Sequence, residues 1–212
     1  MRRWGPIAWL AATTAISACS KPEPSSPAAT TPAATAAPAP ASASNGGRIV
    51  GRVQASGAAV VVLEPKGART FAPQSEKPVM DQVSLMFGPE LLFVRTGQPA
   101  EFRNSDDTLH NVNVKHEETR EQAFNVAIPT GGTFEHTFRR DGFYRVGCDI
   151  HPAMTASIFA ATTPFTTLAG TDGSFAFDDV PPGPWTVTVY TGGKRLHKDV
   201  EINGDVTEVQ IE

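Results

Sequence analysis

The chain has 212 residues, a formal net charge of −4 and only two cysteines. An acidic chain without a long basic run lacks the electrostatic footprint of nucleic-acid-binding proteins, so we expect no nucleic acid among its partners. About 165 residues follow residue 47, a length that suits one medium domain or two small ones.

The N-terminal residues are typical of an exported protein with a lipid anchor. Arg2 and Arg3 precede an apolar stretch that is too short to span a bilayer. The stretch ends in "ISAC", residues 16–19. This resembles the lipobox of bacterial lipoproteins, in which the cysteine is lipidated and becomes the new N-terminus. The resemblance implies a signal peptide over residues 1–18, lipidation of Cys19 and a periplasmic protein anchored to a membrane of the cell envelope. An ordinary signal peptide with a cysteine nearby by chance is the alternative.

Residues 19–46 are predicted to be a disordered tether. Almost all of them are Ala, Pro, Ser or Thr, and none has a large apolar side chain. Such a segment buries too little surface to offset the entropy cost of ordering it. Its prolines favour extended conformations of about 3 Å per residue, which gives a tether tens of Å long.

Short β-branched and aromatic runs, punctuated by Gly, Pro, Asn and Asp, fill the rest of the chain and predict an all-β sandwich architecture. The sequence contains no long helical pattern. The expected strands are Arg48–Val53, Ala58–Glu64, Gln82–Phe87, Glu90–Val94, Ala100–Asn104, Asn111–Val114, Thr133–Phe138, Gly142–Cys148, Ala156–Ala161, Gly173–Phe177, Trp185–Tyr190, Asp199–Ile202 and Glu208–Ile211.

Cys148 is expected to point inward from the end of a strand, because it is in phase with Tyr144 and Val146. If Cys19 is acylated, Cys148 has no disulfide partner within the chain, and a free thiol in an oxidising compartment is prone to oxidation. "CDIHPAM" places an imidazole and a thioether at three-residue intervals after this thiol, and His110 closes a polar loop upstream. Thiolate, thioether and imidazole suit copper better than hard cations, and a His₂Cys set with a weak axial Met is a blue-copper donor set.

"TLHNVNV", residues 108–114, together with "GCDIHPAM", residues 147–154, resembles the cupredoxins, the small blue copper proteins of the plastocyanin, amicyanin and pseudoazurin type. The resemblance implies a cupredoxin Greek-key sandwich over residues 71–162 and one type 1 copper. The implied ligands are His110, Cys148 and His151 in the equatorial plane and Met154 in the axial position.

The same resemblance implies that Asn111 braces the ligand loop and hydrogen-bonds the thiolate. Asp149 departs from the family, which usually has a small hydroxyl residue there, so the sequence does not decide whether Asn111 has this role. The Asp149 carboxylate is also expected to lower the reduction potential, because a nearby negative charge favours Cu(II).

Two other chemistries fit the Cys148 motif less well. Zinc also binds Cys and His, but a thioether such as that of Met154 is a poor zinc ligand. A cysteine hydrolase would need a third residue that orients His151 as a base, and the sequence offers none.

Outside the motif, His136 is expected at the core or its rim, because it alternates in phase with phenylalanines. His116, in a polar excursion, is expected to be solvated.

The C-terminal segment "TDGSFAFDDVPPGPWTVTVY" and the segment "GRIVGRVQASGAAVVVLEP" near residue 50 resemble carboxypeptidase regulatory-like modules, which have a small transthyretin-like or Ig-like β-sandwich fold. Residues 163–212 alone supply too few strands to close such a sandwich. We therefore expect residues 47–70 to supply the first strands, with the cupredoxin domain inserted between the two parts. A plain tandem is the alternative, and in either case the module is expected to be a scaffold or docking unit.

Taken together, these features predict a non-enzymatic, membrane-tethered carrier of single electrons. The cupredoxin resemblance implies that electrons pass through His151, beside the small uncharged residues Pro152 and Ala153, and a redox protein such as a c-type cytochrome is the expected partner. A copper carrier or storage lipoprotein is one alternative, and a cell-envelope interaction module with structural copper is another.

Overall fold

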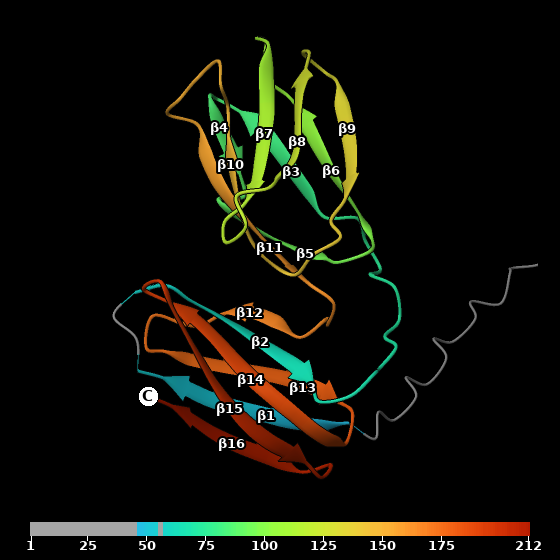
Figure 1. Ribbon diagram of the computed structural model, residues 1–212, viewed down its shortest axis with the longest axis vertical. Helices are drawn as coiled ribbons and strands as arrows, with labels where there is room; N and C mark the ends of the chain where they lie inside the picture. The colour runs from blue at the N-terminus through green and yellow to red at the C-terminus, as the bar shows by residue number, and fades with distance from the viewer. Residues whose placement is uncertain (1–45, 55–56) are drawn as a thin grey trace, which may run out of the picture. The chain divides into compact units, whose positions relative to one another are not determined.

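The computed structural model describes residues 46–54 and 57–212, and this part of the chain contains sixteen β-strands (Figure 1). Cys19, the predicted signal peptide and the predicted tether up to residue 45 lie outside the described residues. Within the described residues, no helix has the length and hydropathy needed to cross a membrane. The all-β prediction is confirmed for this part of the chain.

Nine strands between residues 79 and 161 form two sheets with a shared core. One sheet has the order β4-β3-β6-β9 and the other has the order β5-β11-β10-β7-β8. The strands are β3 (Val79–Val83), β4 (Met86–Gly88), β5 (Leu91–Arg95), β6 (Pro99–Asn104), β7 (His110–His116), β8 (Gln122–Ile128), β9 (Thr133–Thr137), β10 (Gly142–Gly147) and β11 (Thr155–Ala161).

Alternating side chains from both sheets fill the core of this cupredoxin-like sandwich. Phe102 on β6, Val112 on β7 and Ile158 on β11 are fully buried. Each buried side chain of this size stabilises the fold by about 1.5–3 kcal/mol through the hydrophobic effect. The packed core therefore gives β7 and β10 a rigid frame, and both strands lead to the site described below.

Seven further strands form a second sandwich around another apolar core. Its sheets have the orders β13-β1-β16 and β12-β2-β14-β15. The strands are β1 (Gly47–Val53), β2 (Ala59–Pro65), β12 (Thr166–Leu168), β13 (Ser174–Val180), β14 (Gly183–Thr191), β15 (Lys194–Ile202) and β16 (Val206–Ile211). Trp185 is fully buried in this core, and its Nε1–H donates to the Pro181 carbonyl at 2.9 Å. Strands β1 and β2 thus pair with strands from the C-terminal part of the chain, although β3–β11 lie between them in sequence.

The structure corrects one of the expected strands and contains two that were not expected. The single strand expected over Gln82–Phe87 is instead a hairpin of β3 and β4, and its turn residues Ser84 and Leu85 have φ of 54° and 58°. Two successive residues with positive φ are typical of a type I′ turn, which usually contains Asn or Gly. Here the Asp106 carboxylate accepts both turn amides, at 2.6 and 2.9 Å, and so stabilises a turn that its own residue types do not indicate. The two strands that the sequence did not predict are β8 and β12.

Candidate metal centre

Four predicted ligands lie on three neighbouring elements of the cupredoxin-like sandwich. His110 begins β7, Cys148 directly follows β10, and His151 and Met154 lie in the loop before β11. Strands β7 and β10 are antiparallel neighbours, so the start of one lies beside the end of the other. The Cys148 N–H donates to the Met154 carbonyl at 3.2 Å, and the Met154 N–H donates to the His151 carbonyl at 2.9 Å. These two bonds hold the ligand loop in a tight turn.

The donor atoms of His110, Cys148 and His151 face one another. The two imidazole Nδ1 atoms are 2.9 Å apart, and the Cys148 Sγ lies 3.9 Å from Nδ1 of His110 and 3.8 Å from Nδ1 of His151. A metal binds imidazole nitrogen at about 2.0–2.1 Å and thiolate sulfur at about 2.3 Å. Each spacing is shorter than the sum of two such bonds, so one ion can contact all three donors.

Burial also favours a metal site. His110 is fully buried and Cys148 is 4% exposed, whereas His151 is partly exposed. Met154 is 2% exposed and belongs to the same core cluster as Cys148. A soft thiolate, two imidazoles and a thioether in a largely dry pocket match the donor preferences of copper. The cluster of His110, Cys148, His151 and Met154 is consistent with a type 1 copper site.

Asp106 orients His110, a role that the sequence reading missed. The Nε2 of His110 lies 2.8 Å from the Asp106 carboxylate, which also accepts the turn amides of Ser84 and Leu85. Hydrogen bonding from the Leu85 backbone, followed by that from His110, lowers the pKa of Asp106. An ionised carboxylate requires a donor, so Nε2 carries the proton and the Nδ1 lone pair is left for a metal. The only sign of this role in the sequence is that Asp106 lies four residues before His110.

Asn111 lies against the ligand loop. Its Oδ1 accepts the backbone N–H of Asp149 at 2.6 Å and of Ile150 at 3.4 Å, and lies 3.3 Å from the Cys148 sulfur. The departure from the family at Asp149 does not remove this brace, because the donor is a backbone N–H that any residue except proline has. Side-chain amides of Asn113, Asn125 and Asn111 hydrogen-bond the Asp149 carboxylate and lower its pKa.

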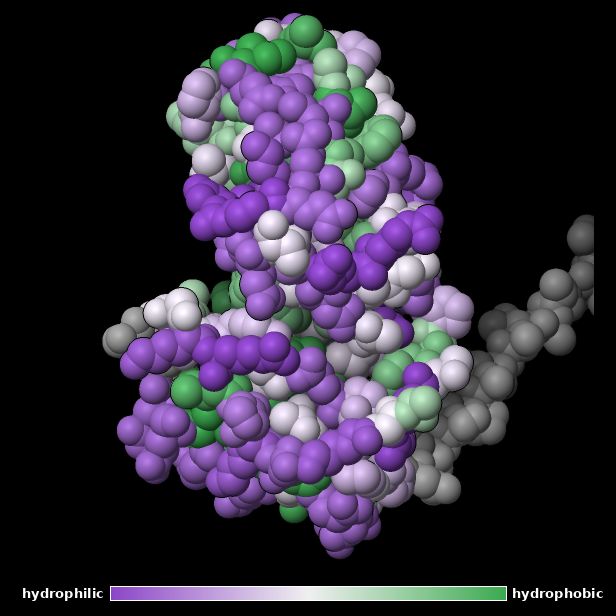
Figure 2. All heavy atoms as spheres, in the orientation of Figure 1, coloured by the Kyte–Doolittle hydropathy of each residue, from purple (hydrophilic) through white to green (hydrophobic). Residues whose placement is uncertain are grey.

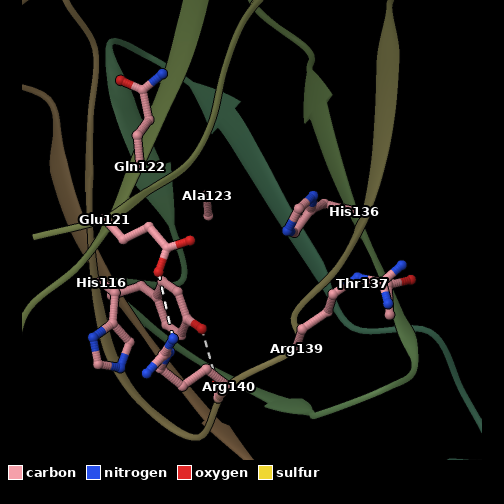
Figure 3. A pocket seen from close by; sticks show the side chains of 9 residues that line it. His116, Glu121, Gln122, Ala123, His136, Thr137, Arg139 and Arg140 are labelled. Atoms are coloured by element: carbon pink, nitrogen blue, oxygen red, sulfur yellow. Dashed lines mark hydrogen bonds and ion pairs between the residues drawn. The ribbon is translucent and has the colours of Figure 1, made fainter. Parts of the chain in front are cut away.

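The two other histidines of this sandwich lie away from the donor cluster, around a cavity at the opposite end of β7 (Figure 3). The prediction of a solvated His116 is wrong, because the side chain is only 4% exposed. Its Nδ1 accepts the Thr119 N–H at 3.2 Å, and its Nε2 contacts the Asp141 carbonyl at 3.1 Å. The polar excursion folds back as a turn between β7 and β8, and this turn covers the ring.

His136 lies on β9 at the rim of the same cavity (Figure 3). Its ring centroid is 4.6 Å from that of Phe124 and 4.8 Å from that of Phe138. Burial, and then the nearby Arg139 charge, lower the pKa of His136. Neither His136 nor His116 belongs to the donor cluster in the described part of the chain.

A two-sheet sandwich with a His-Cys-His donor set at the end of two neighbouring strands defines a cupredoxin domain with a copper site. Residues 75–159 match the family described as copper binding proteins, plastocyanin/azurin family. This part of the chain is therefore a cupredoxin domain of the plastocyanin/azurin family.

Solved structures of copper proteins are similar to the same part of the chain. A reduced mutant of amicyanin is 19% identical with a TM-score of 0.37, and the match covers 42% of this chain and 86% of that one. A purple cupredoxin from Nitrosopumilus maritimus is 21% identical with a TM-score of 0.36, and the match covers 40% of this chain and all of that one. The copper-containing nitrite reductase from Thermus scotoductus is 24% identical with a TM-score of 0.38, and the match covers 46% of this chain but only 25% of that one. A comparison with curated proteins finds no match.

Proposed function

We propose that the protein is a non-enzymatic carrier of single electrons with one type 1 copper. The observation that carries this proposal is that groups of the protein itself hold the donors in place. His110 is held by Asp106, and the ligand loop is held by Asn111, so hydrogen bonds within the protein support the shape of the site. Copper, when bound, supplies the one-electron couple. A ligand set that is fixed by its surroundings limits the rearrangement that accompanies a change of oxidation state.

An apolar surface at the same end of the domain supports docking of a redox partner. His151 is partly exposed, and Ile150, Leu109, Leu85 and Met86 are 47–64% exposed. Figure 2 shows hydrophobic residues gathered at the end of the cupredoxin domain where β7 begins. Leu85 is tied to the site, since its N–H and the His110 ring share the Asp106 carboxylate. Weak redox encounters use small interfaces, often below about 1,200 Å².

The proposal extends to the partner and the location. The net charge of −4 favours a basic partner such as a c-type cytochrome, because opposite charges steer the encounter. Lipidation of Cys19 and the tether over residues 19–46 would hold the copper domain near a membrane of the periplasm. Mass spectrometry of the mature N-terminus tests this part: an acylated Cys19 supports it, and an unmodified N-terminus elsewhere contradicts it.

The second sandwich is proposed to be a carboxypeptidase regulatory-like module made of residues 47–70 and 163–212, with the copper domain of residues 71–162 inserted into it. The pairing of β1 with β13 and β16, and of β2 with β14, supports the insertion over a tandem. Its proposed role is that of a scaffold or docking unit.

Stopped-flow mixing separates the electron carrier from a copper carrier. The reduced, copper-loaded protein is mixed either with an oxidised c-type cytochrome or with a chelating acceptor. The buried donors His110 and Cys148 predict fast oxidation by the cytochrome and slow loss of copper. Fast loss of copper without electron exchange would favour a copper carrier instead.

A further inference from the structure

The carboxylate of Asp149 is surrounded by three asparagine side chains. The Nδ2 groups of Asn111 and Asn125 donate to its Oδ2 at 3.0 and 2.9 Å, and that of Asn113 donates to its Oδ1 at 2.9 Å and to its Oδ2 at 3.2 Å. Asp149 is the residue between the thiol and the rest of the ligand loop. The Asp149 side chain is thus linked to strands β7 and β8.

Strand pairing brings these amides together. Asn111 and Asn113 are two residues apart on β7 and so share a face, and Asn113 pairs directly with Asn125 on β8. Asparagine is a poor strand former, so three of them on one patch of sheet have no local reason to be there. The Oδ1 of Asn113 is buried without a hydrogen-bond partner in the described structure, whereas its Nδ2 faces Asp149. The cluster is therefore arranged around its amide donors and the carboxylate that accepts them.

The cluster also fixes which way the Asn111 amide points. Its Oδ1 must face the loop, because it accepts the backbone N–H groups of Asp149 and Ile150. Its Nδ2 must then face acceptors, and it finds the Asp149 carboxylate and the Asn125 Oδ1 at 2.8 Å. Rotating the amide by half a turn would set donor against donor at the loop and acceptor against acceptor at the Asp149 carboxylate and the Asn125 Oδ1, which leaves polar groups unsatisfied.

We propose that Asp149 is a positioning residue, which acts through the orientation of Asn111 to hold the ligand loop in its metal-binding shape. This inference rests on the proposed copper function for its purpose, but the contacts that carry it are formed by protein groups alone. It differs from a direct effect of the Asp149 charge on the metal, because the geometry assigns the effect to hydrogen bonds that other residues share.

The first test is hydrogen exchange in the copper-free protein, which needs no metal. The backbone N–H groups of Asp149 and Ile150 should exchange about tenfold faster or more in Asp149→Asn, and also in the double variant Asn113→Ala/Asn125→Ala, because the loop opens more readily. Exchange at Val112 in the core should stay unchanged, which shows that the variants remain folded. Asp107→Asn is the matched control, since it removes an exposed carboxylate of the preceding loop and should leave all of these rates unchanged.

The second test is the reduction potential of the copper-loaded variants, and it separates position from charge by sign. If Asp149 acts by position, Asp149→Asn and Asn113→Ala/Asn125→Ala shift the potential in the same direction. If it acts only by charge, Asp149→Asn raises the potential, whereas the double variant lowers it because the carboxylate loses its amide donors. Opposite shifts, or unchanged exchange at Asp149 and Ile150, would overturn the inference. A wild type that forms no type 1 site would instead overturn the proposed function, while the exchange test would still decide the role of Asp149.

Discussion

Two buried histidines, His110 and His116, stand at opposite ends of strand β7, and their surroundings differ in one respect. At His116 both ring nitrogens are engaged by protein groups, Nδ1 by Thr119 and Nε2 by the Asp141 carbonyl. At His110 only Nε2 is engaged in this way, by Asp106, and Nδ1 faces Cys148 and His151. Burial alone therefore does not identify a ligand. A buried histidine is identified as a ligand when one of its ring nitrogens is directed at other donor atoms and not at a hydrogen-bond partner.

The largest expected effect contrasts these two histidines directly. His110→Ala removes a donor and should reduce copper affinity by more than about 100-fold, since even residues that only support ligands contribute 10–100-fold. His116→Ala should leave the affinity within a few-fold of the wild type but reduce the free energy of unfolding by about 2–3 kcal/mol, because it leaves buried partners unsatisfied. Competition with a copper chelator and denaturant unfolding measure the two quantities. Equal losses of affinity in both variants would contradict the comparison.

A smaller effect is expected when the support of His110 is weakened. Asp106→Asn keeps the shape of the side chain but loses the charge that fixes the proton on Nε2, so copper affinity should fall by about 10–100-fold. Asp107→Asn, which changes the next residue, should leave affinity unchanged. The same chelator competition checks both variants, and unchanged affinity in Asp106→Asn would show that His110 needs no such support.

A still smaller effect is expected from charge substitutions on the surface at the two ends of the cupredoxin domain. Ala153→Glu places a bulky charge in the apolar surface beside His151 and should slow electron exchange with a c-type cytochrome by about tenfold, because docking would have to desolvate an unpaired carboxylate. Arg139→Glu, at the other end of the domain, should change the rate far less. Stopped-flow kinetics at low salt measures both rates, with the visible spectrum as a check that the copper site is intact. A larger effect of Arg139→Glu would place docking at the wrong end.

The smallest effect is a pH dependence of stability from His136, which lies away from the donor cluster. Its pKa in the folded protein lies below the usual value of about 6.5, because burial and Arg139 disfavour the charged form. Above about pH 6.5 both states are neutral. As the pH falls below 6.5, the unfolded state takes up a proton first, so stability is lost until the folded pKa is reached. His136→Gln should flatten this part of the profile for the copper-free protein, and identical profiles would contradict the assignment.

The copper ligands could be predicted from the sequence because Cys148, His151 and Met154 are close together and their donor types are distinctive. The groups that support them could not, because they meet only through the fold. Asn113 and Asn125 become neighbours by pairing of β7 with β8, a strand that the sequence reading missed. Asp106 reaches both His110 and the turn at Leu85, and that turn has no Gly or Asn to mark it.

For His116 the sequence pattern was misleading. The polar residues after it indicated exposure, but they form a turn that covers its ring, and the strand before them extends to His116 itself. The strands of the second sandwich were largely predicted from alternation. Their pairing across the intervening copper domain was expected only from the resemblance of two segments to one module, because no local pattern reports contacts so distant in the sequence.

The optical spectrum of the protein loaded with Cu(II) tests the central claim most directly. We predict an intense visible band from charge transfer between the Cys148 sulfur and copper, which Cys148→Ser abolishes and His116→Ala leaves in place. A colourless Cu(II)-loaded protein, or a band that survives in Cys148→Ser, would contradict the assignment of a type 1 site at His110, Cys148, His151 and Met154.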